Sequence, residues 1–93
     1  MQFLVRLSTT LPLTMTEPVR RELLAAEGRR GAELVADGVL EAIWRLPGRL
    51  ANVGIWQCAD AAELHDALTS LPLWPYMEVS VEALAAHPLT TTP

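Results

Sequence analysis

The order of hydrophobic periods along the chain constrains its fold more than any other feature. Residues 2–8 (QFLVRLS) alternate apolar and polar side chains, which is the pattern of a strand with one buried face. A helical pattern follows from the N-cap candidate Thr16 to about Asp37, where Gly38 supplies a C-terminal stop. Pro18 falls in the first turn of this predicted helix, where its missing N–H costs nothing.

The second half of the chain repeats strand and helix signals in a different order. Residues 39–46 and 50–58 predict two strands, and the Pro-Gly-Arg turn between them makes a hairpin. Asp60 with Glu63 is a capping signature for a second helix, which we expect to end near Ser70.

Residues 77–84 alternate again and predict a last strand. The complete order is then β-α-β-β-α-β, the split arrangement of the ferredoxin-like fold, and the predicted fold class is α+β. We expect a four-stranded antiparallel sheet with two helices on one face. Residues 1–88 would form this single domain, and residues 89–93 a polar tail.

A proline-bracketed turn separates the second predicted helix from the last strand. Leu71-Pro72 and Trp74-Pro75 each bias the residue before proline away from the helical region, so the helix must end here. Leu73 and Trp74 are therefore large apolar side chains held on a rigid connection. We expect a neighbouring subunit or the lid of a pocket to cover them.

The composition narrows the class of protein. Of the 93 residues, 51% are hydrophobic and 19% are charged, more apolar surface than a monomer of this size easily buries, so we predict a homo-oligomer. The net charge of -4 argues against nucleic acid as a partner. No apolar run reaches the ~18 residues of a membrane span. Because Met1 leads directly into a strand-like pattern, we expect no signal peptide and a cytoplasmic protein, which the single cysteine, Cys58, also fits.

The first predicted helix offers a candidate base. At about 100° per residue, its apolar stripe is formed by Val19, Leu23, Ala26 and Leu34. Glu27 falls at the edge of this stripe and Arg30 near its middle. A carboxylate that faces the sheet is desolvated, which raises its pKa and makes it a usable general base. The alternative is an i,i+3 surface pair between Glu27 and Arg30, and spacing alone favours that pair.

Other polar or unusual residues leave alternatives open. Asn52 lies in an apolar strand, with Arg45 expected across the hairpin, so its amide bonds either a ligand or a neighbouring backbone group. A lone helical histidine such as His65 is more often structural than catalytic. Gly28 and Gly31 indicate either close backbone packing or simple tolerance.

The histidine and cysteine spacings form no metal motif, and there is no glycine-rich phosphate loop, so we predict no metal and no cofactor.

Several segments together resemble the muconolactone Δ-isomerases. The most specific are LHD at 64–66 and LPLxPYM at 71–77, and the initial FLVR, the central WRLPGRLAN and the later AAHP agree with them. The similarity runs from residue 1 to residue 88. It implies a ferredoxin-like protomer in a ring-symmetric assembly, typically a decamer, that acts on a small lactone in bacterial aromatic catabolism.

The resemblance also implies roles for particular residues. Glu27 matches the position of the family's base, which favours the catalytic interpretation over the surface pair. Asn52 and Arg45 stand at positions suited to hold a carbonyl or carboxylate group of the substrate. His65 and Tyr76 belong to the family signature and are predicted to contact substrate or to support the structure.

The chain departs from the family pattern near the implied site. Gly28 replaces a common lysine, Leu50 a tyrosine, Ala42 a frequent histidine and Trp74 a phenylalanine. Leu50 and Trp74 would then give the pocket a more apolar wall. Some relatives eliminate chloride from 5-chloromuconolactone to give dienelactone, and the departures favour this dehalogenase reaction over isomerisation of muconolactone to 3-oxoadipate enol-lactone. A non-catalytic or monooxygenase-like module on the same fold is the remaining alternative.

Overall fold

The computed structural model describes residues 1–90, in which four antiparallel strands form one sheet with the order β2-β3-β1-β4. The elements along the chain are β1 (Gln2–Thr9), α1 (Glu17–Ala36), β2 (Leu40–Arg45), β3 (Ala51–Gln57), α2 (Ala61–Thr69), the 3₁₀ turn η1 (Trp74–Tyr76) and β4 (Met77–Leu84). The predicted ferredoxin-like β-α-β-β-α-β order is therefore confirmed. The domain boundary at residue 88 stays a prediction, and the tail predicted at 89–93 lies partly outside the described residues.

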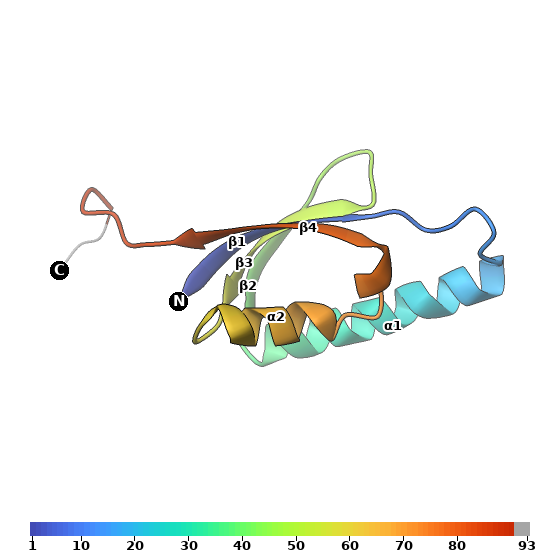
Figure 1. Cartoon of the computed structure of the whole chain (residues 1–93), viewed down its shortest axis with the longest axis horizontal. Coiled ribbons are helices and arrows are strands. Elements are labelled where there is room, and N and C mark those ends of the chain that lie inside the picture. The colour runs from blue at the N-terminus through green and yellow to red at the C-terminus, as the bar shows by residue number, and fades with distance from the viewer. Residues whose placement is uncertain (91–93) are drawn as a thin grey trace.

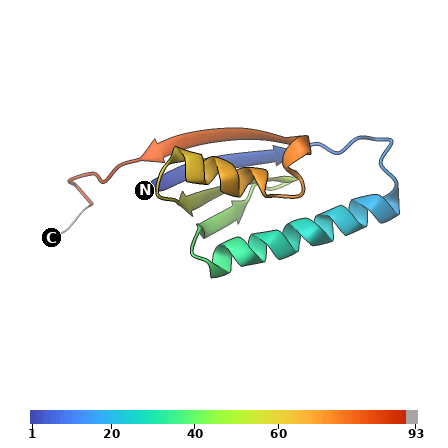
Figure 2. The same ribbon diagram turned by 60° about the horizontal axis from the view of Figure 1, so that its bottom comes forward.

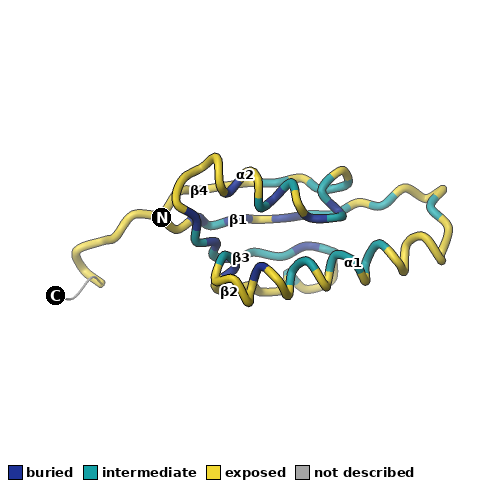
Figure 3. Tube along the Cα trace, turned by 90° about the horizontal axis from the view of Figure 1, so that it is seen from below, coloured by how far each residue is buried: buried dark blue, intermediate teal, exposed yellow. Residues whose placement is uncertain are grey.

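Both helices cover the same face of the sheet and leave the other face open (Figure 1). α2 runs along β1 and β4, whereas α1 runs along β2 and β3 (Figures 2 and 3). The N-terminal part of α1 extends beyond the ends of the strands (Figures 1 and 2). Neither helix in the described part of the chain has the length and apolar character needed to cross a membrane.

The core lies between the sheet and the two helices. Phe3, Val5 and Leu7 alternate along β1, face the helices and are all buried. Each such side chain contributes about 2 kcal/mol of burial free energy. The core is completed by Leu34, Leu40, Trp56, Cys58, Leu64, Leu68 and Leu71.

Only the C-terminal end of α1 packs deeply. Leu34 is the single buried residue of this helix, all of which is described, whereas Val19 in the predicted apolar stripe is 54% exposed. The prediction that Val19 faces the core is wrong, because the first turns of α1 overhang the sheet. Thr16 is the N-cap as predicted, although its side chain makes no capping hydrogen bond.

The predicted cap of α2 is confirmed. The backbone N–H of Glu63 donates to Oδ1 of Asp60 at 2.9 Å, and the N–H of Ala59 donates to Oε2 of Glu63 at 3.0 Å. After α2 the chain enters the turn that was expected to need a cover. Leu73 is 3% exposed and Trp74 packs against the core, so much of that cover comes from the chain itself.

The open face of the sheet carries apolar side chains. Leu4 is the register partner of Ile55, and Trp44 is the partner of Val53. Trp44 is 56% exposed, and the other three are only partly buried. A single chain therefore leaves an apolar strip of its sheet in contact with water.

The glycines of the chain differ sharply in what surrounds them. A Cβ on Gly54 would lie 2.8 Å from the backbone oxygen of Ala42 and 3.3 Å from Cδ1 of Leu40, so β2 can approach β3 only because this side chain is absent. A Cβ on Gly28 or Gly31 would meet no atom of residues 1–90 within 4 Å beyond its own helical neighbourhood. Close packing within the chain therefore does not explain either helical glycine, and the structure of the single chain favours simple tolerance.

We expect Gly54→Ala to lower the free energy of unfolding by about 1–3 kcal/mol, because β2 must shift. Gly31→Ala is the matched control, and it should raise the same free energy by about 0.5–1 kcal/mol through helix propensity. Urea denaturation of both variants checks the prediction. Equal effects of one sign would contradict it.

Candidate active site

Glu27 lies partly buried between α1 and the turn that precedes β4. Its Oε1 accepts a hydrogen bond of 2.9 Å from the backbone N–H of Leu73. Burial raises the pKa of Glu27, and the Leu73 N–H opposes this by stabilising the charged form. The surface pair that spacing favoured does not form among the described residues, since Arg30 instead lies 3.7 Å from Glu33. Glu27 thus has the raised basicity expected of a general base.

The local sequence explains why the Leu73 N–H is available. The N–H of Leu71 donates to the oxygen of Leu68, and Pro72 has no N–H to offer. The N–H of Trp74 then donates to the oxygen of Leu71. Between these bonds the Leu73 N–H leaves the turn and reaches α1. The proline-bracketed turn therefore positions one backbone donor at the carboxylate.

Arg45 and Asn52 reach the same region from the β2–β3 hairpin. They are register partners, and Asn52 also pairs with Leu7, whose side chain is buried under the helices. The Oδ1 atom of Asn52 is buried and has no hydrogen-bond partner among residues 1–90. An unsatisfied buried acceptor costs about 1–3 kcal/mol. The structure therefore gives this oxygen no backbone partner, and the ligand interpretation of Asn52 stays a prediction.

The Arg45 guanidinium is only weakly held by the protein. Its Nη1 donates to the backbone oxygen of Ala51 over 3.5 Å, at the long limit for a hydrogen bond. Its remaining N–H groups leave it able to bind an anionic group.

A cavity of about 200 Å³ joins these polar groups. Glu27, Arg45 and Asn52 contribute its charged and amide groups. The remaining lining residues are mostly apolar: Thr9, Leu24, Gly28, Leu50, Leu73 and Met77. A small apolar cavity with a few convergent polar groups is the usual form of a small-molecule site.

A larger hollow of about 400 Å³ lies toward the open face of the sheet. Its charged residues Arg6, Arg49 and Glu78 are exposed. Size alone would favour this hollow as the ligand-binding site. We prefer the smaller cavity because it holds a desolvated carboxylate and an unsatisfied buried amide oxygen.

The other predicted site residues lie elsewhere in the single chain. His65 is exposed on α2, and its ring meets Trp74 edge-on, with centroids 6.3 Å apart. These two line a separate hollow with residues of α2 and β4. The backbone oxygen of Tyr76 accepts a hydrogen bond from the N–H of Thr10. The predicted site residues that the structure brings together are Glu27, Arg45, Leu50 and Asn52.

Sequence reasoning did not assign Thr9, Leu24, Leu73 and Met77 to this site. Leu73 acts through its backbone, which carries no side-chain signal, and only the spacing of the two prolines hints at it. Thr9 and Met77 are register partners at one end of the β1–β4 pair. Their proximity to Glu27 follows from strand register and cannot be read from the sequence.

The arrangement can perform one kind of chemistry well. A desolvated carboxylate can remove a proton from carbon, and a guanidinium with an amide can hold the oxygens on which negative charge develops. Residues 1–90 bring these groups into one cavity with apolar walls. The site is suited to moving a proton on a small, oxygen-rich, acidic molecule.

Comparison with known proteins identifies the family to which the chain is similar. Residues 1–90 match the family model of Muconolactone delta-isomerase. Muconolactone Delta-isomerase 2 of Acinetobacter lwoffii is 38% identical over 87 residues, which cover 94% of this chain and 91% of that protein. Muconolactone Delta-isomerase of Pseudomonas aeruginosa is 37% identical and covers 95% of this chain and 92% of its own length.

A solved structure agrees over the whole chain. The crystal structure of muconolactone isomerase at 3.3 Å resolution superposes with a TM-score of 0.92 at 32% sequence identity. The match covers 100% of this chain and 97% of that one. Sequence, fold and site thus converge, and the chain belongs to the muconolactone Δ-isomerase family.

Proposed function

We propose that this protein isomerises muconolactone to 3-oxoadipate enol-lactone, with Glu27 as the base. The observation that carries the proposal is the desolvated Glu27 carboxylate, which shares a cavity with Arg45 and with Asn52, whose amide oxygen has no partner among residues 1–90. The curated relatives are named for this isomerisation, which supports it over the chloride elimination that the sequence departures favoured.

In the first step Glu27 takes the γ proton of the lactone ring. The C–H electron pair enters the conjugated system and gives a dienolate, whose negative charge reaches the lactone carbonyl oxygen. Oε1 of Glu27 is occupied by the Leu73 N–H, and Oε2 has no hydrogen-bond partner among the described residues. Oε2 is therefore the atom that receives the proton.

The second step returns a proton to the α carbon and moves the double bond. The protonated Glu27 can supply this proton, so the cycle needs no other acid. Asn52 can donate its amide N–H to the lactone oxygen after rotation of the amide, and Arg45 can pair with the carboxymethyl group. The bond from Asn52 favours the dienolate over the neutral lactone, because negative charge develops on that oxygen. The pairing with Arg45 fixes the orientation of the substrate.

A second candidate reaction is chloride elimination from 5-chloromuconolactone. Loss of the same γ proton then expels chloride from the neighbouring side-arm carbon and gives dienelactone. Gly28 and Leu50 both line the cavity, so this wall lacks the lysine and tyrosine side chains common in the family. An apolar wall suits chlorine, and elimination needs no proton returned to the α carbon.

We also propose that the protein acts as a homo-oligomer. The exposed Trp44 and the partly buried Leu4, Val53 and Ile55 on the open sheet face support this, because a second subunit would remove them from water. The decamer and the cytoplasmic location stay predictions.

The variant Glu27→Gln should lower kcat for muconolactone by at least about 10³-fold, because it keeps the shape of the side chain and removes the base. Glu22→Gln, on an exposed position of the same helix, is the control and should keep nearly full activity. Steady-state kinetics on both variants checks this. Full activity of Glu27→Gln would remove Glu27 from the mechanism and favour a non-catalytic or different role for the fold.

The raised pKa of Glu27 predicts two pH effects. The value of kcat/KM should decrease as the pH is lowered, because only the carboxylate can accept the proton. The apparent pKa of this decrease should lie above the ordinary glutamate pKa. The folded state also holds this proton more tightly than the unfolded chain. Stability from Glu27 is therefore full below the unfolded pKa and lost as pH rises through the folded pKa. Unfolding free energies of wild type and Glu27→Gln across pH should diverge in this window, and parallel curves would contradict the shift.

Incubation with both lactones separates the two reactions. We expect enol-lactone from muconolactone at a higher kcat/KM than chloride release from 5-chloromuconolactone. Absorbance spectra and a chloride electrode measure the two products. Faster chloride release would make elimination the main reaction, and the Gly28→Lys variant would then test whether the missing side chain is the cause.

A further inference from the structure

The part of α1 that carries Glu27 has little apolar packing to fix it. Leu34 is the one buried residue of this fully described helix, and Glu27 precedes it by about 10 Å along the axis at 1.5 Å per residue. A carboxylate base, however, works only when it is held in register with the atom it deprotonates. Some other interaction must therefore hold this stretch of α1 beside the turn that precedes β4.

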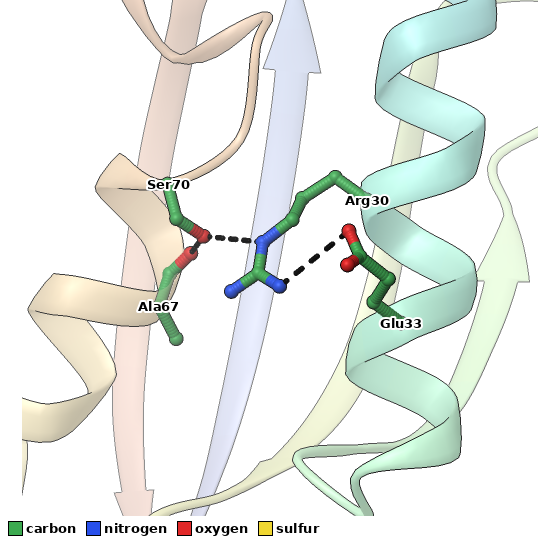
Figure 4. A network of polar contacts seen from close by, with 4 residues as sticks. All are labelled: Arg30, Glu33, Ala67 and Ser70. Carbon is green, nitrogen blue, oxygen red and sulfur yellow. Dashed lines mark hydrogen bonds and ion pairs between the residues drawn. The ribbon is translucent and has the colours of Figure 1, made fainter.

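Arg30 makes that connection, one helical turn after Glu27. Its Nε donates to Oγ of Ser70 at 2.9 Å, across the space between α1 and α2 (Figure 4). Its Nη1 lies 3.7 Å from Oε1 of Glu33 on its own helix. The side chain is 30% exposed, so it is better shielded than its partner Glu33 at 64%. Arg30 is thus supported by α1 while it bonds to the end of α2.

Ser70 is well placed to transmit this contact. It is the C-cap of α2, and its Oγ donates to the backbone oxygen of Ala67 at 2.6 Å while accepting from Arg30. Both hydrogen-bonding roles of the hydroxyl are therefore used. Three residues later, Leu73 N–H bonds to Glu27, and Pro72 restricts the backbone between them. Arg30–Ser70 and Glu27–Leu73 form two antiparallel bridges, one turn apart, between α1 and the same short connection.

We propose that Arg30 is a positioning residue, which acts through Ser70 to keep the Leu73 N–H on Oε1 of Glu27 and so orients Oε2 toward the substrate. This inference rests on the proposed role of Glu27 as the base. It goes beyond that role because neither Arg30 nor Ser70 lines the cavity, and within residues 1–90 neither side chain bonds to the Glu27 carboxylate.

The other interpretation is that Arg30 forms only an i,i+3 surface pair with Glu33. Arg20 provides the internal comparison, because it also sits on α1 with a glutamate three residues away, at 3.9 Å from Glu17. Among the described residues Arg20 has no bond to a second element. A surface-pair role predicts equal behaviour of the two arginines, and a positioning role does not.

The sharpest variant is Ser70→Ala, because it removes the acceptor for Arg30 without changing any charge. Its control is Thr69→Ala, since the Thr69 hydroxyl also bonds backbone oxygens of the last turn of α2, but within residues 1–90 it makes no hydrogen bond to α1. Arg30→Gln is paired with Arg20→Gln in the same way. Ser70→Thr keeps the hydroxyl and should restore function.

We expect Ser70→Ala and Arg30→Gln each to lower kcat on muconolactone about tenfold, with KM changed less than about twofold. The double variant should lose no more than about tenfold, because both changes break one bridge. The two control variants should stay within about twofold of wild type. Additive losses, or equal losses in the controls, would overturn the proposal.

A second measurement does not depend on the lactone. The ¹³C resonance of the Glu27 carboxyl, assigned with Glu27→Gln, should titrate at a higher pH in Ser70→Ala than in wild type, because the carboxylate loses the Leu73 donor that lowers its pKa. Thr69→Ala and Ser70→Thr should titrate as wild type, with folding checked by thermal unfolding. An unchanged titration in Ser70→Ala would refute positioning while leaving the proposed function intact. A shifted titration in a protein that does not turn over muconolactone would support the bridge and reject that substrate.

Discussion

The hydrogen bond from the Leu73 N–H to the Glu27 carboxylate is the interaction on which the site depends. It joins the long helix, which packs deeply only near its C-terminal end, to the rigid connection between α2 and β4. It also lets a carboxylate stay charged in a place where burial favours the protonated form. Because one oxygen is fixed, the other is left for the substrate of the proposed reaction. A single backbone donor thus orients the proposed base and moderates its pKa.

The cavity around this bond is costly for the folded state. Glu27 is desolvated, and the buried Oδ1 of Asn52 lacks a partner among residues 1–90. Both features lower stability unless a ligand or another subunit satisfies them. Functional sites commonly retain such groups, because a fully satisfied cavity would have no reason to bind substrate. The same reasoning explains why Arg45, with one long hydrogen bond, remains available to an anion.

Much of the fold was predictable because its signals are local. Strand alternation, the Asp60–Glu63 cap and the stop at Gly38 each involve neighbouring residues, and the structure confirms the elements they predict. The sequence-based predictions fail where the structure depends on contacts between residues far apart in the sequence. The apolar stripe of α1 was expected to include Val19, which is exposed because the helix overhangs the sheet. Gly54, with no local signal, is the glycine that strand packing requires.

The sequence by itself determined the order of elements, since periodicity is a property of neighbouring residues. Its motifs determined the family and, through that resemblance, Glu27 as the candidate base. The tertiary structure decided which candidates meet. It gathered Glu27, Arg45, Leu50 and Asn52 in one cavity and placed His65, Trp74 and Tyr76 outside it. It also showed that the proline-bracketed segment, which the sequence marked only as unusually apolar, donates the Leu73 N–H to Glu27. Strand register and helix placement are set by long-range packing, so these decisions could not be read along the chain.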